Sequence, residues 1–187
     1  MLRKIAISLW LFVVLCALVA YVIWPQPFDP SSIARLLNDN RDSALILYLI
    51  LSVVRGFTLV PSTTLVIAGT LAFPAEPWLV LAISIAGITA SSSMIYWFSE
   101  SLGMAEHFEM RKPSAVARIR RRLEHPTGIG FVFLWAFFPL VPTDAVCYVA
   151  GSTRMHFGKF IAAITAGELV LCCFYVFSFG WAINKFA

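Results

Sequence analysis

Three ionisable residues stand inside long apolar stretches of this 187-residue chain: Arg55, Asp144 and Glu168. A charged side chain at the centre of a bilayer costs at least ~2.5–3.5 kcal/mol on insertion scales and normally faces a partner or a cavity. A guanidinium offers a planar fork of donors to a phosphate. A carboxyl in apolar surroundings favours its neutral form, which suits proton transfer. The chemistry expected of these residues is therefore anion binding and proton movement inside a membrane.

Each of the three residues also has a structural explanation. Arg55 either binds a phosphate or forms a structural ion pair with Asp144. Asp144 either pairs or carries a proton, or it caps the helix that follows Pro142 by accepting from the first amides. Glu168 either takes part in proton coupling or is a protonated carboxyl bonded to a backbone carbonyl. We expect the functional role for Arg55 and Glu168, and for Asp144 both explanations stay open.

The backbone around these residues carries a repeated phrase. A Leu-Val-Pro sequence ends at Pro61 and again at Pro142, and an Ala-Gly pair follows each, ending at Gly69 and Gly151. Proline interrupts a helix, and at membrane depth such backbone is tolerated only where protein or a water-filled cavity surrounds it. Matching interruptions in two halves of a chain point to a transport site. The candidate transport site therefore comprises Arg55, Pro61, Asp144, Tyr148 and Glu168, and the residues expected to shape the interruptions are Gly56, Gly69, Pro139, Pro142 and Gly151.

The composition is that of an integral membrane protein. The chain is 60% hydrophobic and 13% charged, and its mean hydropathy is +0.84. Soluble domains are nearer half apolar and a quarter charged. We expect one all-α membrane domain over 1–187, with no nucleic-acid partner. No Ser-His-Asp, paired-carboxylate or metal-ligand pattern gathers near one membrane face, so no enzyme, metal or other cofactor is expected.

The positions of proline, glycine and charge divide the chain into elements. The region 1–42 contains an uncharged stretch at Ile5–Trp24, typical of a membrane span rather than a cleaved signal peptide. A short outer interfacial helix follows, for which Asp29 before Pro30 is the predicted N-cap. Repeat 1 at 43–99 and repeat 2 at 129–187 each combine an interrupted segment with a full span. In repeat 1, two half-length helices, about Ala44–Val54 and Ser62–Leu71, would each reach roughly 15 Å, near the bilayer midplane. Each interrupted segment is therefore predicted to be a re-entrant hairpin.

The loop 100–128 decides the predicted topology because it is rich in arginine. Arg118, Arg121 and Arg122 lie on a predicted amphipathic helix at Pro113–Glu124, and the positive-inside rule places such a loop in the cytoplasm. With the N-terminus also cytoplasmic, the hairpins enter from opposite leaflets as an inverted repeat. These arginines and Arg154 either act only as a topology signal, which is sufficient, or contact lipid headgroups.

Two motifs resemble those of a known family. Arg55–Gly69 reads R-x5-P-x7-A-G, and Pro139–Gly151 reads P-x2-P-x-D-x3-Y-x2-G. Together with the glycine-containing span that follows, they resemble the VTT-domain superfamily, which includes the bacterial DedA proteins and the SNARE-associated Golgi proteins. The resemblance implies two opposed re-entrant hairpins and lipid translocation. It also implies a bacterial cytoplasmic membrane protein, with phospholipid or a polyprenyl phosphate as partner.

The chain departs from the better-known DedA pattern at both hairpins. The stretch 133–143 contains no arginine, and the acidic residues that flank the first hairpin proline are replaced by Ser62, Thr63 and Thr64. The assignment to undecaprenyl phosphate is therefore weakened. The expected function is a flippase or scramblase of anionic lipid with protons as possible coupling ions, and a homo-oligomer is compatible with it. The alternatives are a proton-coupled transporter of a small solute or ion and a membrane scaffold without transport activity.

Overall fold

The structure is a computed structural model that describes residues 12, 15, 16, 19–21, 23–58, 60–101, 113–138 and 143–186. All regular elements of these residues are helical. The α-helices are α2 (Pro30–Asp39), α3 (Ala44–Val54), α4 (Ser62–Ala72), α5 (Pro77–Ser101), α7 (Pro113–Glu124), α8 (Pro126–Phe137), α9 (Thr143–Ser152) and α10 (Phe157–Phe186). Short 3₁₀ turns are η1 (Gln26–Phe28), η2 (Arg41–Ser43) and η3 (Arg55–Thr58).

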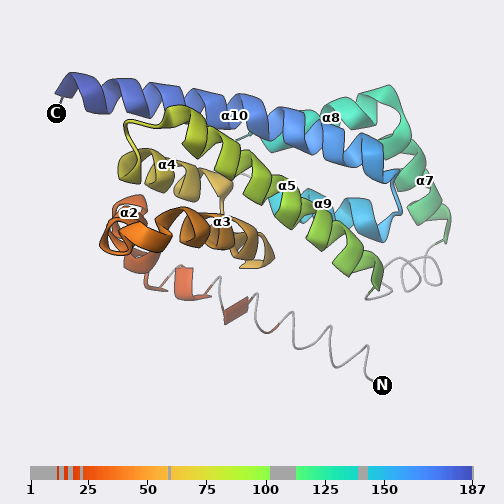
Figure 1. The fold of residues 1–187 in the computed structure, drawn as a ribbon. Helices are drawn as coiled ribbons and strands as arrows, with labels where there is room; N and C mark the ends of the chain where they lie inside the picture. The colour runs from red at the N-terminus through yellow and green to blue at the C-terminus, as the bar shows by residue number, and fades with distance from the viewer. Residues whose placement is uncertain are drawn as a thin grey trace.

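The two long helices α5 and α10 form the centre of the molecule. They contact each other, α3, α4, α8 and α9 pack on one or both of them, and α2 and α7 pack on α4 and α8 instead (Figure 1). The 25 residues of α5 and the 30 of α10 correspond to about 38 and 45 Å at 1.5 Å per residue. Both contain stretches that are long and apolar enough to cross a membrane, Pro77–Ser99 and Phe157–Trp181. The predicted full spans are thus present as helices.

The interrupted segments form helices of about half that length. The helices α3, α4, α8 and α9 have 11, 11, 12 and 10 residues, so each is about 15–18 Å long. The break between α3 and α4 is the turn η3 followed by Pro61, which occupies the N-cap of α4. The predicted bounds of this first pair are confirmed, except that α4 extends to Ala72. Pro139 and Pro142, in the second break, lie outside the described residues.

The contacts of the short helices follow the same pattern in the two halves. In each half the first short helix lies against the long helix of its own half, α3 on α5 and α8 on α10. The second short helix crosses to the other half, so α4 packs on α10 and α9 packs on α5. Figure 1 shows α4 and α9 toward opposite ends of the α5–α10 pair. The junction between the halves therefore lies where α4 and α9 begin.

Glycines allow close approach at equivalent places in this arrangement. A Cβ added to Gly87 of α5 would collide with Ser52 of α3. A Cβ added to Gly167 of α10 would lie 2.5 Å from the carbonyl oxygen of Phe133 in α8. Small residues permit such close helix contacts, which provide much of the packing energy in a membrane. The hydrogen bond of 2.7 Å between the hydroxyls of Ser84 and Tyr48 joins α5 to α3 on the same face.

Two amphipathic helices lie at the periphery. The side chain of Asp29 caps α2 by accepting from the amide of Ser31 at 3.0 Å, as predicted, and the bonds to Ser31 hold the pKa of Asp29 below its usual value. Helix α2 packs on α4 and buries Leu37. The predicted helix Pro113–Glu124 is confirmed as α7, which packs on α8. The predicted span Ile5–Trp24 lies mostly outside the described residues.

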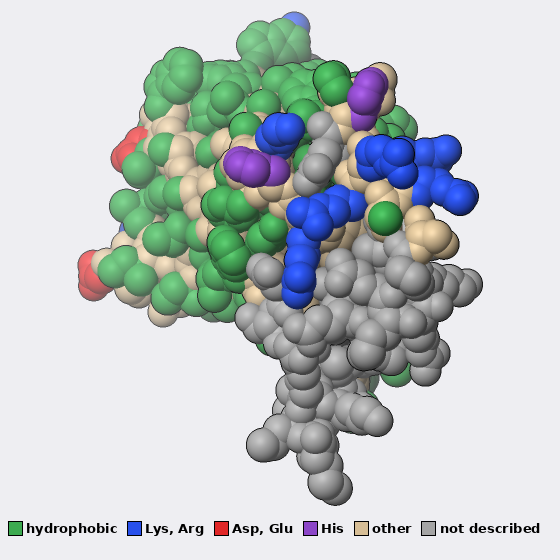
Figure 2. Space-filling model, turned by 90° about the vertical axis from the view of Figure 1, so that its right-hand side faces the viewer, with side chains coloured by type: hydrophobic (Ala, Val, Ile, Leu, Met, Phe, Trp, Pro, Cys, Tyr) green, Lys and Arg blue, Asp and Glu red, His purple; other side chains and the backbone are tan. Residues whose placement is uncertain are grey.

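Positive charge gathers at one end of the molecule. Figure 2 views the end where α7 lies and where α8 and α10 begin, and Lys, Arg and His side chains collect on this face. The described basic side chains of these segments are Arg118, Arg120, Arg121, Arg122, Arg154 and Lys159. The described acidic side chains at the surface belong instead to 29–42 and to the turn before α5.

Candidate functional site

The first contact of the candidate site is an ion pair between the two halves. Arg55 begins η3 directly after α3, and Asp144 is the second residue of α9. The Nη1 of Arg55 donates to Oδ2 of Asp144 at 3.1 Å and to the carbonyl oxygen of Val60 at 3.2 Å. The two side chains are only 6% and 1% exposed. The ion pair that the sequence offered as a structural explanation is therefore present, and it joins the breaks of both halves.

The second contact is a carboxyl that holds the beginnings of both crossing helices. Glu168 of α10 is 0% exposed. The hydroxyl of Ser62 donates to its two oxygens at 3.3 and 3.1 Å, and the hydroxyl of Thr143 donates to Oε1 at 2.5 Å. Ser62 is the first residue of α4 and Thr143 is the first residue of α9. Negative charge is favourable at helix N-termini because the unpaired amides carry partial positive charge there. These hydroxyls, and not a backbone carbonyl, are the partners that the structure gives Glu168.

We call Arg55, Ser62, Thr143, Asp144 and Glu168 the polar cluster. With both carboxyls ionised its formal charge is −1, and one bound proton makes it neutral. The Nη2 of Arg55 and the Oδ1 of Asp144 are buried and have no hydrogen-bond partner among the described residues. Buried polar atoms are normally paired, and unpaired ones mark places where a further group can bind. The cluster therefore has one donor and one acceptor to offer.

The predicted hairpin residues of the first half lie close to this cluster or to α3. A Cβ added to Gly56 would lie 2.8 Å from Cβ of Ser91 and 3.2 Å from Oδ1 of Asp144, so the absence of a side chain lets η3 approach both. Gly69 lies against the ring of Tyr48. Pro61 precedes Ser62, and its extended ψ of 138° directs the chain into α4.

In the second half, the described residues divide between the cluster and the apolar core. Tyr148 lies one turn after Asp144 in α9 and is buried in the core cluster that includes Tyr96 and Phe160. Gly151 lies against Ser99 and the backbone of Tyr96 in α5. Tyr148 and Gly151 therefore belong to the packing of α9 on its neighbours.

The predicted headgroup residues lie away from the polar cluster. Arg118, Arg121 and Arg122 line a hollow of about 340 Å³ with His125, whose ring accepts from the amide of Thr127 and caps α8. Arg154 follows the end of α9 with a positive φ of 52°. The bonds from the amides of Arg154 and Met155 to the carbonyls of Gly151 and Ala150 form the Schellman pattern of a helix C-terminus.

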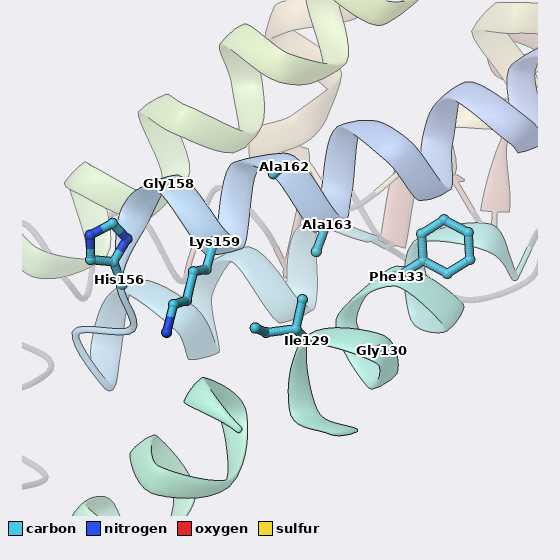
Figure 3. A pocket seen from close by; sticks show the side chains of 8 residues that line it. All are labelled: Ile129, Gly130, Phe133, His156, Gly158, Lys159, Ala162 and Ala163. Atoms are coloured by element: carbon cyan, nitrogen blue, oxygen red, sulfur yellow. The ribbon is translucent and has the colours of Figure 1, made fainter. Parts of the chain in front are cut away.

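A further hollow of the described structure is also separate from the cluster. It measures about 620 Å³ and lies between α8 and the beginning of α10 (Figure 3). Its wall is apolar apart from His156 and Lys159, which are exposed. Beside Arg55, in contrast, the space bordered by Tyr48, Ser52 and Ser62 is too narrow for a water molecule. The site is thus closed on this side.

Sequence reasoning missed the roles of Ser62 and Thr143. It treated Ser62 only as a replacement for an acidic residue, and it gave Thr143 no role. The signal was present, because each follows the repeated Leu-Val-Pro phrase directly and each carries a hydroxyl. Their common partner was not predictable, since it depends on how α10 packs between α4 and α9. Within the described ranges, no three His, Cys, Asp or Glu side chains gather closely enough to hold a metal ion.

A comparison with family models matches residues 60–180 to the VTT domain. The chain belongs to the VTT-domain family. This is the domain of the DedA and SNARE-associated Golgi proteins, so the resemblance predicted from the two motifs is confirmed. VTT-domain proteins are membrane proteins, in agreement with the two long apolar helices. Comparisons with curated proteins and with solved structures found no match. Four members of the polar cluster lie in the VTT domain, and Arg55 precedes the matched segment.

Proposed function

We propose that this VTT-domain protein is a lipid translocase, a flippase or scramblase that moves phospholipid or polyprenyl phosphate between the leaflets of a bacterial cytoplasmic membrane. The observation that carries the proposal is the polar cluster. Buried ionisable groups are costly in a membrane protein and typically mark substrate or proton pathways. Here they meet where two interrupted segments begin their second helices, the arrangement found at transport sites with broken helices.

The proposed topology is an inverted repeat in which α3–α4 and α8–α9 are re-entrant hairpins from opposite faces. Its support is the length of the four helices, about half of a ~30 Å hydrocarbon layer each. The placement of α4 and α9 toward opposite ends of the α5–α10 pair also supports it. The positive end of the molecule would face the cytoplasm, because short cytoplasmic loops are enriched in Lys and Arg. The N-terminus would then be cytoplasmic as well.

In the proposed mechanism the lipid headgroup crosses along the polar cluster while its acyl chains stay in the bilayer. The free Nη2 of Arg55 supplies a donor for the phosphate, and the beginnings of α4 and α9 add the positive ends of two helix dipoles. Binding of an anion would compete with Asp144 for Arg55. A proton on Asp144 or Glu168 would offset the charge of the phosphate. It would also weaken the bonds by which that carboxyl holds a residue of the other half. Movement of α4 and α9 in turn would then expose the site to each leaflet.

The proposal includes no covalent change of the lipid, so the protein would not act as an enzyme. Its partners would be anionic phospholipid or lipid phosphate, together with protons. Assembly into a homo-oligomer is compatible with the mechanism, because each chain carries a complete polar cluster.

The test is lipid translocation by the purified protein in liposomes. A fluorescent phospholipid that is quenched from outside should exchange between leaflets faster than in protein-free liposomes. Arg55→Ala, Asp144→Asn and Glu168→Gln should each slow the exchange, whereas Arg41→Ala, which removes an exposed arginine of η2, should not. Wild-type protein without any acceleration would contradict the proposal. Unchanged rates in all three cluster variants would remove the cluster from the mechanism.

A proton-coupled solute transporter would use the same carboxyls, and proton flux distinguishes the two. A pH-sensitive dye inside the same vesicles should report no proton uptake driven by small solutes. Solute-driven uptake without lipid exchange would favour the solute transporter.

A further inference from the structure

An apolar groove reaches Arg55 from the periphery of the molecule. It has a volume of about 220 Å³ and lies between η1, α2, α3 and the beginning of α4. Leu36 of α2 and Val54 of α3 line it and remain 45% and 54% exposed, so the groove has an accessible edge. Arg55, Val60 and Leu65 are the buried residues of its lining, so they mark its inner end.

Arg55, at the inner end, has a terminal nitrogen without a hydrogen-bond partner among the described residues. Arg55 is 94% buried, one of its two terminal nitrogens pairs with Asp144, and the other has no partner among the described residues. A guanidinium nitrogen without a partner in an apolar site favours an anion, because hydrogen bonds between ionised groups are about twice as strong as neutral ones. The remaining wall is almost entirely hydrocarbon, which matches an alkyl chain.

We propose that this groove is the lateral opening through which an anionic membrane lipid reaches the polar cluster, with an acyl chain along the apolar wall and its phosphate on Nη2 of Arg55. The proposal rests on the proposed function and specifies the substrate as a lipid phosphate. The groove is too small for a whole phospholipid and holds the part of the chain nearest the headgroup. Inorganic phosphate lacks the alkyl chain and would gain nothing from the wall.

The groove also gives α2 a role. Its apolar side packs on α4, and Ile33 and Leu36 continue that side into the groove. Polar groups lie among the apolar ones on the way inward: Thr58, whose hydroxyl donates to the carbonyl of Arg55 at 2.7 Å, and Thr64. Thr64 and Phe28 also border a neighbouring hollow of about 330 Å³ beside Asp29. The opening would therefore lie on the side of the bilayer occupied by α2.

The larger hollow between α8 and α10 fits this role less well. Its two basic residues, His156 and Lys159, are exposed and lie at the positive end of the molecule, away from the polar cluster. The charged groups that a lipid would contact in this hollow are exposed to solvent. Arg55 is not among the residues that line the hollow. Of these two hollows, the groove at Arg55 is the one that combines an alkyl wall with a buried cation.

The test is photocrosslinking to full-length protein in nanodiscs, followed by mapping of the labelled peptide. The probe is a phosphatidate with a diazirine in its acyl chain, and the control probe is the diacylglycerol with identical chains. Labelling within 51–65 should favour the phosphatidate by about tenfold or more, because a charge-assisted hydrogen bond contributes about 1.5–3 kcal/mol. Excess unlabelled phosphatidate should compete, and inorganic phosphate should not.

A matched pair of variants locates the probe. Val54→Trp fills the groove and should lower labelling about tenfold, since forcing a large side chain against an occupant costs about 1–3 kcal/mol. Ile50→Trp is one helical turn away on α3, equally exposed and outside the groove, and should label like wild type. Both variants are at half-exposed positions, so both should fold, and their unfolding temperatures check this.

Labelling and transport together separate the two proposals. If wild type exchanges lipid but Val54→Trp labels and exchanges like Ile50→Trp, the groove proposal is overturned and the translocase proposal stands. If no protein exchanges lipid but phosphatidate still labels 51–65 selectively, the groove is a lipid site and the translocase proposal falls. Equal labelling by phosphatidate and diacylglycerol would also overturn the groove proposal.

Discussion

The two short-helix pairs of this protein, α3–α4 and α8–α9, share their contacts but differ in charge. Each pair has one helix on the long helix of its own half and one on the long helix of the other. The first pair supplies the cation Arg55 and the second supplies the anion Asp144. At the offset that relates Pro61 to Pro142, Arg55 corresponds to Ala136 and Asp144 corresponds to Thr63. The two pairs therefore pack in a similar way, while each half contributes a different charge to one shared site.

The charges therefore belong to the junction between the halves and not to a feature that both halves share. The hydroxyls at the beginnings of α4 and α9 are the chemical feature that both halves retain, and both bind Glu168. The hydroxyl bonds to Glu168 thus come from equivalent positions of the two halves. The ion pair of Arg55 and Asp144 beside them joins positions that are not equivalent.

The largest effect is expected from breaking the ion pair. Asp144→Ala leaves the buried guanidinium of Arg55 without its anion, which should cost about 3–5 kcal/mol of the free energy of unfolding. The measurement is reversible unfolding in bicelles, with Asp42→Ala, an exposed carboxylate of η2, as control. The double variant Arg55→Met with Asp144→Leu should recover most of the loss but should not translocate lipid. Asp144→Ala with wild-type stability would show that the ion pair does not hold the halves together.

The next effect concerns close packing within each half. Gly87→Ala and Gly167→Ala should each cost about 1–3 kcal/mol, because a Cβ at either position overlaps the neighbouring short helix. Gly130→Ala in α8 is the matched control: its Cβ would meet nothing within 4 Å, and the better helix propensity of Ala should stabilise by up to about 1 kcal/mol. Unfolding of the three variants under one condition gives the comparison. A loss at only one of the two packed glycines would mean that the halves are packed differently.

A smaller effect is expected from the hydroxyls that bind Glu168. Ser62→Ala and Thr143→Val should each cost about 1–2 kcal/mol, with the larger loss at Thr143 because its bond of 2.5 Å is shorter than those of Ser62. In a Glu168→Gln background both losses should shrink, and a double-mutant cycle measures this coupling. Additive losses in the cycle would show that the hydroxyls do not act through Glu168.

The smallest effect is expected at the end of α9. Arg154→Gly should stabilise by about 1 kcal/mol, because its φ of 52° strains a residue with a side chain. Arg118→Gly, in the interior of α7, should instead lose about 1 kcal/mol. Thermal unfolding of both variants is sufficient to see the opposite signs. A loss at Arg154 would mean that the contacts of its side chain outweigh the backbone strain.

Local signals in the sequence predicted the helices well. Proline and glycine mark the ends of α3, α4 and α7, and Asp29 before Pro30 gave the cap of α2. The ion pair of Arg55 and Asp144 was expected as one of two explanations, because a buried charge needs a partner.

The contacts that sequence reasoning did not predict depend on how the helices pack against one another. The hydroxyl partners of Glu168 depend on the rotation of α10 against two other helices. The groove at Arg55 depends on where α2 rests on α4. The exposed His125, directly before Pro126, caps α8, and sequence reasoning gave it no such role. No periodicity within a single segment encodes such contacts between segments.

The most direct test of the opposed-hairpin account is sidedness of labelling in intact bacteria. Ala75, in the turn between α4 and α5, and Ser114, in α7, are both exposed and can be changed singly to cysteine after Cys16 and Cys173 are replaced by serine. A maleimide that cannot cross the membrane should label the cysteine at 75 from outside. It should label the cysteine at 114 only after the cells are opened. Labelling of both positions from the same side would place both hairpins on one face and would contradict the account.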